Sequence, residues 1–473
     1  MKEKLLRLFF GLRKAEITEE DKGRLMDFYK KLLIIAWPAA LEGLLLSLIN
    51  SLDTMMVGKL GSEAIAAVGL CGQPRMILLL LVQSLCVGTT AIVARRKGAN
   101  NQVAAVSCLK QSLVIITGLG IFITIAGYFL AEPLLRLSGA ADDTLPYALT
   151  YFRITSAVYL ANCWTMCICA AMRGIGKTRI TMVVNMAANL VNVFLNFCLI
   201  SGRLGFPAMG IRGAALATAI GTCVGCVMAF YVVIRNDGYL SLRHAGSFRP
   251  ERETMMGLIK IGSGTILESV CMRVGFLITG RMIAGVSTAA YATNQVVSQV
   301  SGLSFTLGDG VSSACVSLVG QSLGAERKDH AKLYVRVAQR ISLFVSAGLI
   351  LFMFFGRNFL PTLFSEEQAI IQGAALGFLV LIFGIYHQNM RVVLSGALRG
   401  AGDVKYVALV SLVSVAVLRP LTTWLFCYPL NALFPALQLG FTGPWLSFVL
   451  DSFVRAGMLS YRVKKGNWVN IRV

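Results

Sequence analysis

The sequence predicts an all-α membrane protein of about twelve transmembrane helices, arranged as two six-helix bundles related by a pseudo-two-fold axis along the membrane normal. Three observations support this fold: long apolar runs, an uneven distribution of Lys and Arg, and an internal repeat. Of the 473 residues, 56% are hydrophobic and 14% are charged, and the mean hydropathy is +0.70. Water-soluble domains are typically about 45–50% apolar and about 25% charged, so this chain is too apolar to be one of them.

Apolar runs recur along the whole chain. A run of roughly 20 residues is long enough to cross a hydrocarbon core of about 30 Å as a helix. Segments with strict apolar–polar alternation are absent, which favours helices over a membrane β-barrel. Short polar segments rich in Gly, Asn and Arg separate the runs. The predicted helices span residues 32–57, 62–93, 108–131, 146–171, 178–200, 211–234, 254–282, 287–318, 335–356, 368–397, 404–427 and 442–462.

The positions of Lys and Arg predict how these helices are oriented. If the chain crosses the membrane at each helix, 32 of the 44 Lys and Arg fall on one side and 6 on the other. Loops rich in Lys and Arg stay in the cytoplasm, so both termini are expected to be cytoplasmic in a multi-pass protein of the cell membrane. The net charge of +21 is therefore attributed to membrane topology and anionic lipid, and nucleic acid is not expected as a partner.

Landmarks that recur at a fixed distance indicate that the chain is a duplication. Three pairs lie 226 residues apart: Glu42 with Glu268, Gly98-Ala99 with Gly324-Ala325, and Arg173-Gly174-Ile175-Gly176 with Arg399-Gly400-Ala401-Gly402. A fourth pair, Gly210-Ile211-Arg212-Gly213 and Gly440-Phe441-Thr442-Gly443, is 230 apart. Each half holds six helices, so both enter from the same side, and a substrate path is expected between them. The predicted parts are a cytoplasmic tail (1–31), an N-terminal six-helix lobe (32–234), a cytoplasmic linker (235–253), a C-terminal six-helix lobe (254–462) and a second tail (463–473).

Asp53 is the sharpest candidate for a functional side chain. It follows the mostly apolar stretch from Leu44 to Leu52, and a carboxylate at membrane depth is costly unless it has a role. Such a group tends to hold a proton or bind a cation, which suits ion-coupled transport. The alternative is an Asp that caps a helix or lies at the membrane interface. The residue 226 positions later is Thr279, so the repeat itself does not require an acid here.

The predicted fifth helix carries four Asn residues. Their spacings of 4, 3 and 4 place Asn185, Asn189, Asn192 and Asn196 on one helical face. Unpaired amides facing lipid are unfavourable, so this face is expected to point into the bundle. Two readings stay open: interhelical hydrogen bonds that hold the bundle together, and an ion site that includes Asp53.

Other polar residues inside the apolar runs are weaker candidates. Glu42 and Glu268 occupy equivalent positions of the repeat, and structural pairing with Arg is the main alternative to a functional role. Lower-ranked candidates for a substrate cavity are Gln83, Gln295, Gln388, Glu42 and Asp309. The acids inside the helices, Asp451 among them, have potential partners in Arg153, Arg273, Arg391 and Arg419.

Signatures of enzymes and of ATP-driven pumps are missing from the sequence. It contains no P-loop, and its three His residues form no metal-ligand or catalytic spacing. The cluster Cys163, Cys167 and Cys169 fits small apolar side chains within a helix better than a metal or redox site. We therefore expect neither an enzyme nor a cofactor other than a coupling ion.

Several motifs together resemble those of the multidrug and toxic compound extrusion (MATE) transporters. Leu52-Asp53-Thr54-Met55-Met56-Val57-Gly58-Lys59-Leu60-Gly61 is similar to the signature of the family's first helix, and Val319-Gly320-Gln321-Ser322-Leu323-Gly324-Ala325 to a motif that follows helix eight. Phe206-Pro207-Ala208-Met209-Gly210 and Leu398-Arg399-Gly400-Ala401-Gly402-Asp403 also match. The resemblance spans about residues 32–462 and implies a V-shaped, two-lobed exporter of organic, often cationic, compounds, driven by inward H⁺ or Na⁺.

The resemblance also implies roles for individual residues. Asp53 falls on the family's first-helix Asp, which acts in cation coupling, and Asn192 and Asn196 fall on an Asn and Asp pair that completes the site in some members. Tyr151, Thr218 and Glu268 match further ion-coupling positions less closely, and Gln388 stands where the sodium-coupled branch has an Asp. Asn189, on the same helical face as Asn192 and Asn196, is a further lower-ranked candidate for ion coupling. Because Asn196 and Gln388 both replace acids, the choice between H⁺ and Na⁺ stays open.

The expected function is export of organic drugs or toxic compounds by cation-coupled antiport with alternating access. Small organic molecules and membrane lipid are the expected partners, and the protein is expected to be a monomer. The alternative within the same superfamily is a flippase or exporter of lipid-linked or polysaccharide precursors, which the intramembrane Arg residues keep open. A membrane-embedded enzyme or a receptor is the alternative from a different class.

Overall fold

The computed structural model describes residues 25–58, 60–235, 238–364, 367–434 and 439–471. Within these ranges the regular secondary structure is entirely helical. Ten of the described helices are long and apolar enough to cross a membrane, and the pair Leu145–Ser156 (α7) and Tyr159–Gly174 (α8), bent by 51°, makes an eleventh span. The last predicted span is Leu439–Lys465 (α18), which carries Asp451 and Arg455 in its apolar stretch. The predicted helical membrane fold is confirmed.

Contacts divide the chain into two compact units. The N-terminal unit is Leu41–Gly262, and the C-terminal unit combines Met1–Ala40 with Ser263–Val473. The helices Leu25–Gly58 (α3) and Arg252–Val286 (α11) contribute to both units. The first described helix, α3, includes residues 25–31, which were predicted as part of the tail, and residues 1–24 of that tail lie outside the described residues.

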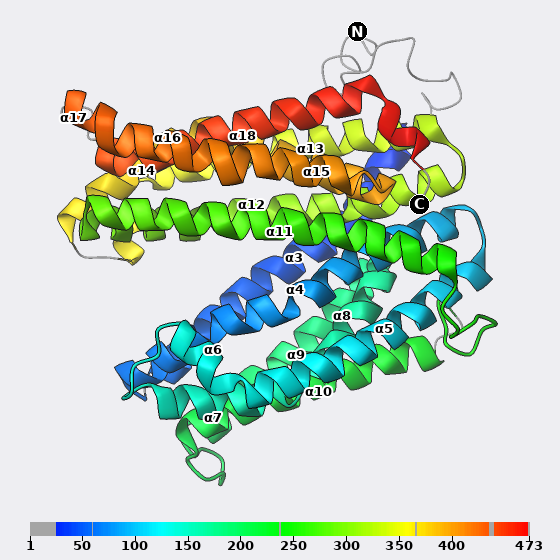
Figure 1. Cartoon of the computed structure of the whole chain (residues 1–473), viewed down its shortest axis with the longest axis horizontal. Helices are drawn as coiled ribbons and strands as arrows, with labels where there is room; N and C mark the ends of the chain where they lie inside the picture. Colours follow the sequence, from blue (N-terminus) through cyan, green and yellow to red (C-terminus); the bar gives the residue numbers. More distant parts are fainter. Residues whose placement is uncertain (1–24, 59, 236–237, 365–366, 435–438, 472–473) are drawn as a thin grey trace. The chain divides into compact units, whose positions relative to one another are not determined.

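In the N-terminal unit, α4 packs against α5 and α8, and α10 packs against α9 and α7 (Figure 1). Glycines allow the close contacts of α10: a Cβ on Gly221 would lie 2.6 Å from the carbonyl oxygen of Ala188 on α9. The N-cap Asn101 accepts a hydrogen bond from the backbone N–H of Ala104 and so fixes the start of α5. Besides the second part of α3, the helices of this unit are Ser62–Gly98 (α4), Gln102–Phe129 (α5), Ala131–Leu137 (α6), α7, α8, Thr178–Leu199 (α9) and Gly210–Arg235 (α10).

In the C-terminal unit, α14 packs against α12, α13 and α18 (Figure 1). Its buried residues include Phe378 and Leu381, which share one apolar cluster with Trp445 of α18. Besides parts of α3 and α11, this unit contains Thr288–Gly324 (α12), Lys328–Gly356 (α13), Gln368–Ala401 (α14), Val404–Ser411 (α15), Arg419–Leu425 (α16), Asn431–Leu433 (α17) and α18.

Two predicted helices are not continuous. The predicted helix 146–171 is broken between α7 and α8, where the side-chain hydroxyls of Thr155 and Ser156 hydrogen-bond to carbonyls three and four residues earlier. Such bonds weaken and bend a helix. The predicted helix 404–427 is interrupted by π-helical turns at Leu412–Leu418 and Phe426–Leu430. Pro420 follows the first turn and Pro429 lies in the second, and each lacks the N–H that a regular helix needs.

Candidate functional site

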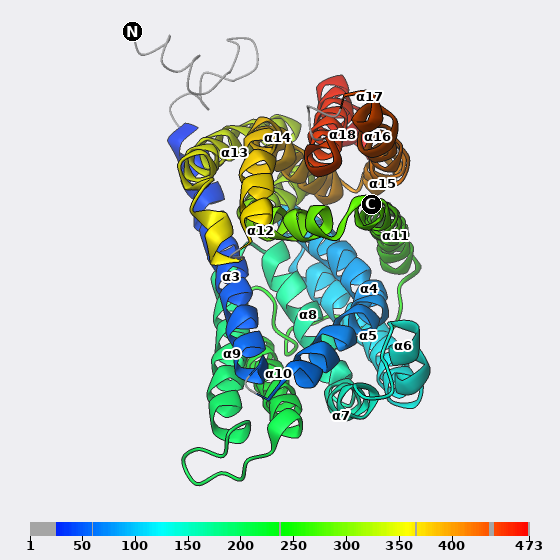
Figure 2. The same ribbon diagram turned by 90° about the vertical axis from the view of Figure 1, so that its left-hand side faces the viewer.

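Asp53 on α3 lies against the Asn face of α9. The Asn196 amide donates a 2.9 Å hydrogen bond to Asp53 Oδ1, and the Asn185 amide donates a 2.6 Å hydrogen bond to Glu42 Oε1. Both pairs are 143 residues apart in sequence, so α3 and α9 run side by side in the same direction (Figure 2). Asn185 and Asn196 therefore point toward α3 inside the bundle, as the sequence predicted for the Asn face.

A hydrogen-bonded chain extends from Asp53 across the unit to α10 and α7. Asn196 Nδ2 also donates to Asn192 Oδ1 at 2.8 Å, and Asn192 Nδ2 donates to Thr218 Oγ1 at 3.1 Å. The hydroxyl of Tyr151 lies 3.5 Å from Thr218 Oγ1. The structure therefore brings together five side chains that the sequence and the family resemblance singled out separately.

These side chains line a cavity of about 310 Å³. All four Asn residues of α9 contribute to its wall, as their spacing predicts for one helical face. Sequence reasoning missed several other polar residues of the wall, because isolated polar residues in long apolar helices carry no periodic signal. They are Asn50, Thr54, Arg75, Thr155, Asn162, Thr165 and Thr222.

The site offers carboxylate, amide and hydroxyl oxygen atoms. Asp53 is half-buried, and Asn192 and Asn196 are buried. Asn196 Oδ1 is buried and has no hydrogen-bond partner among the described residues. A buried carbonyl oxygen without a partner is unfavourable, and a cation or a protonated group beside it would satisfy it. No group of three His, Cys, Asp or Glu side chains suited to a metal occurs in the described part of the chain. A bound Na⁺ would therefore be held by one carboxylate together with amide and hydroxyl oxygens.

Glu42 lies at the other end of the Asn face and is held by structural contacts. Besides Asn185, the hydroxyl of Thr181 donates to Glu42 Oε2 at 3.1 Å, and Arg173 Nη1 lies 3.9 Å from Oε1. Asn189 donates to the backbone carbonyl of Asn185 at 2.7 Å. Glu42 is not among the residues that line the cavity, so its predicted place in a substrate cavity is not supported by this geometry.

The repeat carries a second Glu–Arg pair at the equivalent place. Arg399 donates two hydrogen bonds to Glu268, at 2.6 and 3.2 Å, in the C-terminal unit. The structure thus pairs Glu42 with Arg173 and Glu268 with Arg399, two arginines that were not among the partners considered from the sequence. The 226-residue offset that relates Glu42 to Glu268 also relates Arg173 to Arg399, and this shared offset was the signal that could have identified both pairs.

The C-terminal unit has a cavity of about 360 Å³ built on equivalent positions. Its wall includes Thr279, Gln388 and Arg391. These three follow Asp53, Asn162 and Thr165, all in the wall of the N-terminal cavity, by 226 residues. The duplicated frame therefore forms a cavity in each half, but with different side chains.

Of the other residues predicted to line a substrate cavity, one does so and three do not. Gln388 is buried and lines the C-terminal cavity, whereas Gln83, Gln295 and Asp309 are exposed. Gln295 donates to the hydroxyl of Tyr291 at 2.9 Å, and Asp309 lies within electrostatic range of Arg399. These three do not belong to the wall of either cavity.

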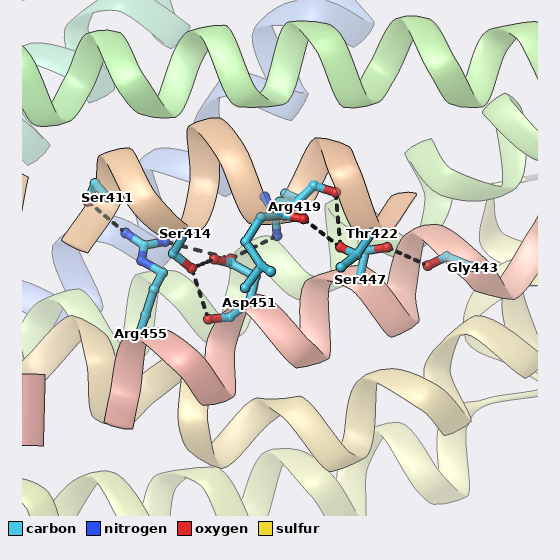
Figure 3. A network of polar contacts seen from close by, with 9 residues as sticks. Ser411, Ser414, Arg419, Thr422, Gly443, Ser447, Asp451 and Arg455 are labelled. Atoms are coloured by element: carbon cyan, nitrogen blue, oxygen red, sulfur yellow. Dashed lines mark hydrogen bonds and ion pairs between the residues drawn. The ribbon is translucent and has the colours of Figure 1, made fainter. Parts of the chain in front are cut away.

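A buried ionic network lies beside the C-terminal cavity (Figure 3). Asp451 on α18 is fully buried, and its Oδ2 lies 3.7 Å from Arg419 Nη2 and 3.9 Å from Arg455 Nη1. Ser414 donates a short hydrogen bond to Asp451 Oδ1, and Arg455 Nη2 donates to Ser411 Oγ at 3.3 Å. Arg419 was predicted as a partner for an intramembrane acid, whereas Arg455 was missed.

Long apolar helices that enclose polar cavities define this chain as an integral membrane protein of the transporter class. Comparisons with known proteins identify the family. A sequence model of the MatE family matches residues 38–198 and 265–425, once in each half. The chain therefore belongs to the MATE family of transporters, and the double match confirms the duplication.

Two relatives extend over nearly the whole chain. The protein named "Uncharacterized transporter YisQ" from Bacillus subtilis is 26% identical over 435 residues, which cover 91% of this chain and 93% of that protein. The "Probable multidrug resistance protein NorM" of Thermotoga maritima is 27% identical over 456 residues, 94% of each chain. A crystal structure of a MATE protein in the bent conformation has a TM-score of 0.85 at 21% identity and covers 95% of this chain and 98% of its own. This structural similarity shows the shared fold.

Proposed function

We propose that this MATE transporter is a cation-coupled antiporter that exports small organic compounds, cationic drugs and toxic compounds in particular, by alternating access. The observation that carries the proposal is the half-buried Asp53, bonded to Asn196 at 2.9 Å in the wall of a polar cavity inside a membrane unit. A carboxylate in this setting takes up a proton or Na⁺ readily. The name of the Thermotoga relative, a multidrug resistance protein, supports the class of substrate.

Asp53 would couple ion entry to substrate export through its contact with α9. A proton on the carboxylate, or Na⁺ between Asp53 and the amide oxygens, changes the bond to Asn196 and so the contact between α3 and α9. Asn192, Thr218 and Tyr151 pass this change to α10 and α7. Coupling requires that ion and substrate each prefer a different state of the transporter, because a ligand that binds both states equally shifts nothing.

The remaining parts of the proposal follow from composition and charge. The excess of Lys and Arg on one side supports cytoplasmic termini in the cell membrane. We propose that the protein acts as a monomer and needs no cofactor besides its coupling ion. The uncharged Asn196 and Gln388 do not decide between H⁺ and Na⁺, so both ions have to be tested.

The test is dye transport by purified protein in proteoliposomes. A fluorescent organic cation is loaded, and a H⁺ gradient or a Na⁺ gradient is imposed separately. The wild type is expected to move the dye with at least one gradient, and Asp53→Asn to move it at the rate of protein-free liposomes. Asp142→Asn, at an exposed acid on the loop after α6, is the matched control and is expected to behave as the wild type. Wild-type transport by Asp53→Asn would refute the assignment.

The alternative is a flippase or exporter of lipid-linked or polysaccharide precursors. It is favoured by a specific observation, the two arginines Arg391 and Arg419 in the wall of the C-terminal cavity. Transfer of a fluorescent lipid-linked sugar across the liposome membrane, without dye movement under either gradient, would support this alternative over the antiporter.

A further inference from the structure

The ionic network of the C-terminal unit contains more positive than negative charge. Arg391, Arg419 and Arg455 are 6%, 4% and 3% exposed, and all three lie within electrostatic range of Asp451, which is 0% exposed. Glu268 is the next acid, but it is already engaged by two hydrogen bonds from Arg399. Three buried guanidinium groups thus share a single carboxylate.

The arginine contacts to Asp451 are ion pairs without direct hydrogen bonds, and one carboxylate balances only one of the three positive charges. Arg419 and Arg455 approach Asp451 Oδ2 only to 3.7 and 3.9 Å, beyond hydrogen-bond distance (Figure 3). Arg391 Nε is buried and has no hydrogen-bond partner among the residues that the structure describes. Buried charges without close counter-charges are strongly unfavourable, so a purely structural network would be expected to balance its charge.

Two of these arginines reach a cavity. Arg391 and Arg419 line the C-terminal cavity of about 360 Å³ together with aromatic side chains. The Arg419 guanidinium carbon lies 4.9 Å from the ring centre of Phe276 and 4.7 Å from that of Phe448, so the two rings fix its position. A guanidinium held in this way presents its N–H groups to a planar anion, and the rings offer an apolar surface beside it.

The excess of arginine over acid is specific to this half of the repeat, because the wall of the N-terminal cavity holds Arg75 together with Asp53. The residues equivalent to Arg391 and Arg419 in the N-terminal unit are Thr165 and Val193, 226 positions earlier. With the 230-residue offset of the last helices, Asp451 and Arg455 correspond to Gly221 and Gly225, which line the N-terminal cavity. The duplicated frame therefore does not require the arginines.

We propose that the C-terminal cavity binds an anionic group carried on an apolar or aromatic body. A carboxylate, sulfonate or phosphate would be held by Arg391 and Arg419, and the attached body would lie against Phe276 and Phe448. This site goes beyond the cation exchange at Asp53 and does not depend on it. The anion comes either from a soluble organic compound or from the head group of an anionic lipid, and both share this chemistry.

Binding of 2-naphthoate to the purified full-length protein in a neutral detergent tests the site. The neutral 2-naphthamide has nearly the same shape and serves as the matched ligand. The wild type is expected to bind naphthoate about ten- to a hundredfold more tightly than naphthamide, the range expected for hydrogen bonds to a charged group. Equal affinity for the two ligands would overturn the proposal, and this comparison requires no variant.

Variants then test whether the preference for naphthoate depends on the arginines of the cavity. Arg391→Gln is expected to remove the preference for naphthoate, and Arg391→Lys to keep part of it. Arg153→Gln, at an exposed arginine of α7 in the other unit, makes the same change of charge and is expected to bind as the wild type. Unchanged naphthoate binding by a folded Arg391→Gln protein, with its thermal unfolding midpoint within a few degrees of the wild type, would also overturn the proposal.

Competition distinguishes the two sources of the anion. Phosphatidic acid that displaces naphthoate from the wild type, where phosphatidylcholine does not, would identify a lipid head group. Naphthoate binding that phosphatidic acid leaves unchanged would identify a soluble organic anion. Both results support the site. Binding is measured without any ion gradient, so a negative result would not bear on the proposed antiport at Asp53, which the transport assay tests separately.

Discussion

The two cavities of this transporter occupy equivalent positions of a duplicated frame but carry different charge. The N-terminal cavity has Asp53, Arg75 and a row of amides, and the C-terminal cavity has Thr279 and two arginines at its wall. The Glu–Arg pairs that join equivalent helices, Glu42 with Arg173 and Glu268 with Arg399, occur in both halves. The duplication preserved the frame and the position of each cavity, whereas a few side chains set the charge.

Backbone packing differs between the halves at the same place. In the N-terminal unit, Gly221 lets α10 approach the regular helix α9, and the cavity extends to this glycine. Its equivalent in the C-terminal unit is Asp451, which faces a helix interrupted by π-helical turns. A charged side chain at this position needs partners from the neighbouring helix, and Ser414, within the first π-helical turn, is one of them.

The largest predicted effect concerns the buried acid. Asp451→Asn leaves three buried guanidinium groups without a carboxylate, and removing one partner of a buried ion pair destabilises by about 3–5 kcal/mol. The thermal unfolding midpoint in detergent, followed by tryptophan fluorescence, is expected to fall markedly. Asp142→Asn, at the exposed acid, is the control. An unchanged midpoint for Asp451→Asn would show that the network does not stabilise the C-terminal unit.

The next effect tests the close packing of the N-terminal unit. The Cβ of Gly221→Ala would lie 2.6 Å from the Ala188 carbonyl oxygen, so α9 and α10 must move apart, which costs about 1–3 kcal/mol. Gly69→Ala is the matched control, because a Cβ there meets nothing within 4 Å. It is expected to leave stability unchanged or raise it slightly. Equal unfolding midpoints for the two variants would contradict the packing argument.

A smaller effect separates the two Glu–Arg pairs. Glu268→Gln weakens the paired hydrogen bonds from Arg399 and is expected to destabilise by about 1.5–3 kcal/mol. Arg173→Gln removes a 3.9 Å contact with Glu42 and leaves the hydrogen bonds from Asn185 and Thr181 to Glu42 in place, so it is expected to cost about 1 kcal/mol or less. The two unfolding midpoints, measured in the same detergent, give the comparison. A larger loss for Arg173→Gln would reverse this order.

The smallest effect is expected at Thr279. Its hydroxyl is buried and has no hydrogen-bond partner among the described residues, so Thr279→Val removes no bond and keeps the shape. The free energy of unfolding is expected to change by less than about 0.5 kcal/mol. A destabilisation similar to that of Glu268→Gln would show that this hydroxyl has a structural role.

Local and periodic features were predictable from the sequence. The helical fold, the duplication and the single Asn face follow from apolar run length, constant offsets and helical spacing, whereas the contact of this face with Asp53 was one of two alternatives. The break after Thr155 and the Asp451 network were missed. Both depend on which side chains meet after packing: Arg455 lies one turn from Asp451 on the same helix, and only contacts with neighbouring helices show that both are buried.

In the proposed mechanism, coupling depends on the acid of the N-terminal cavity together with its amide partners. The most direct test moves the acid between the two cavities and measures ion-driven dye efflux in proteoliposomes. Asp53→Asn is expected to reduce efflux to the rate of protein-free liposomes. Adding Thr279→Asp is expected not to restore it, because the positions equivalent to Asn192 and Asn196 are Leu418 and Thr422. Wild-type efflux by Asp53→Asn, or full recovery in the double variant, would contradict the account.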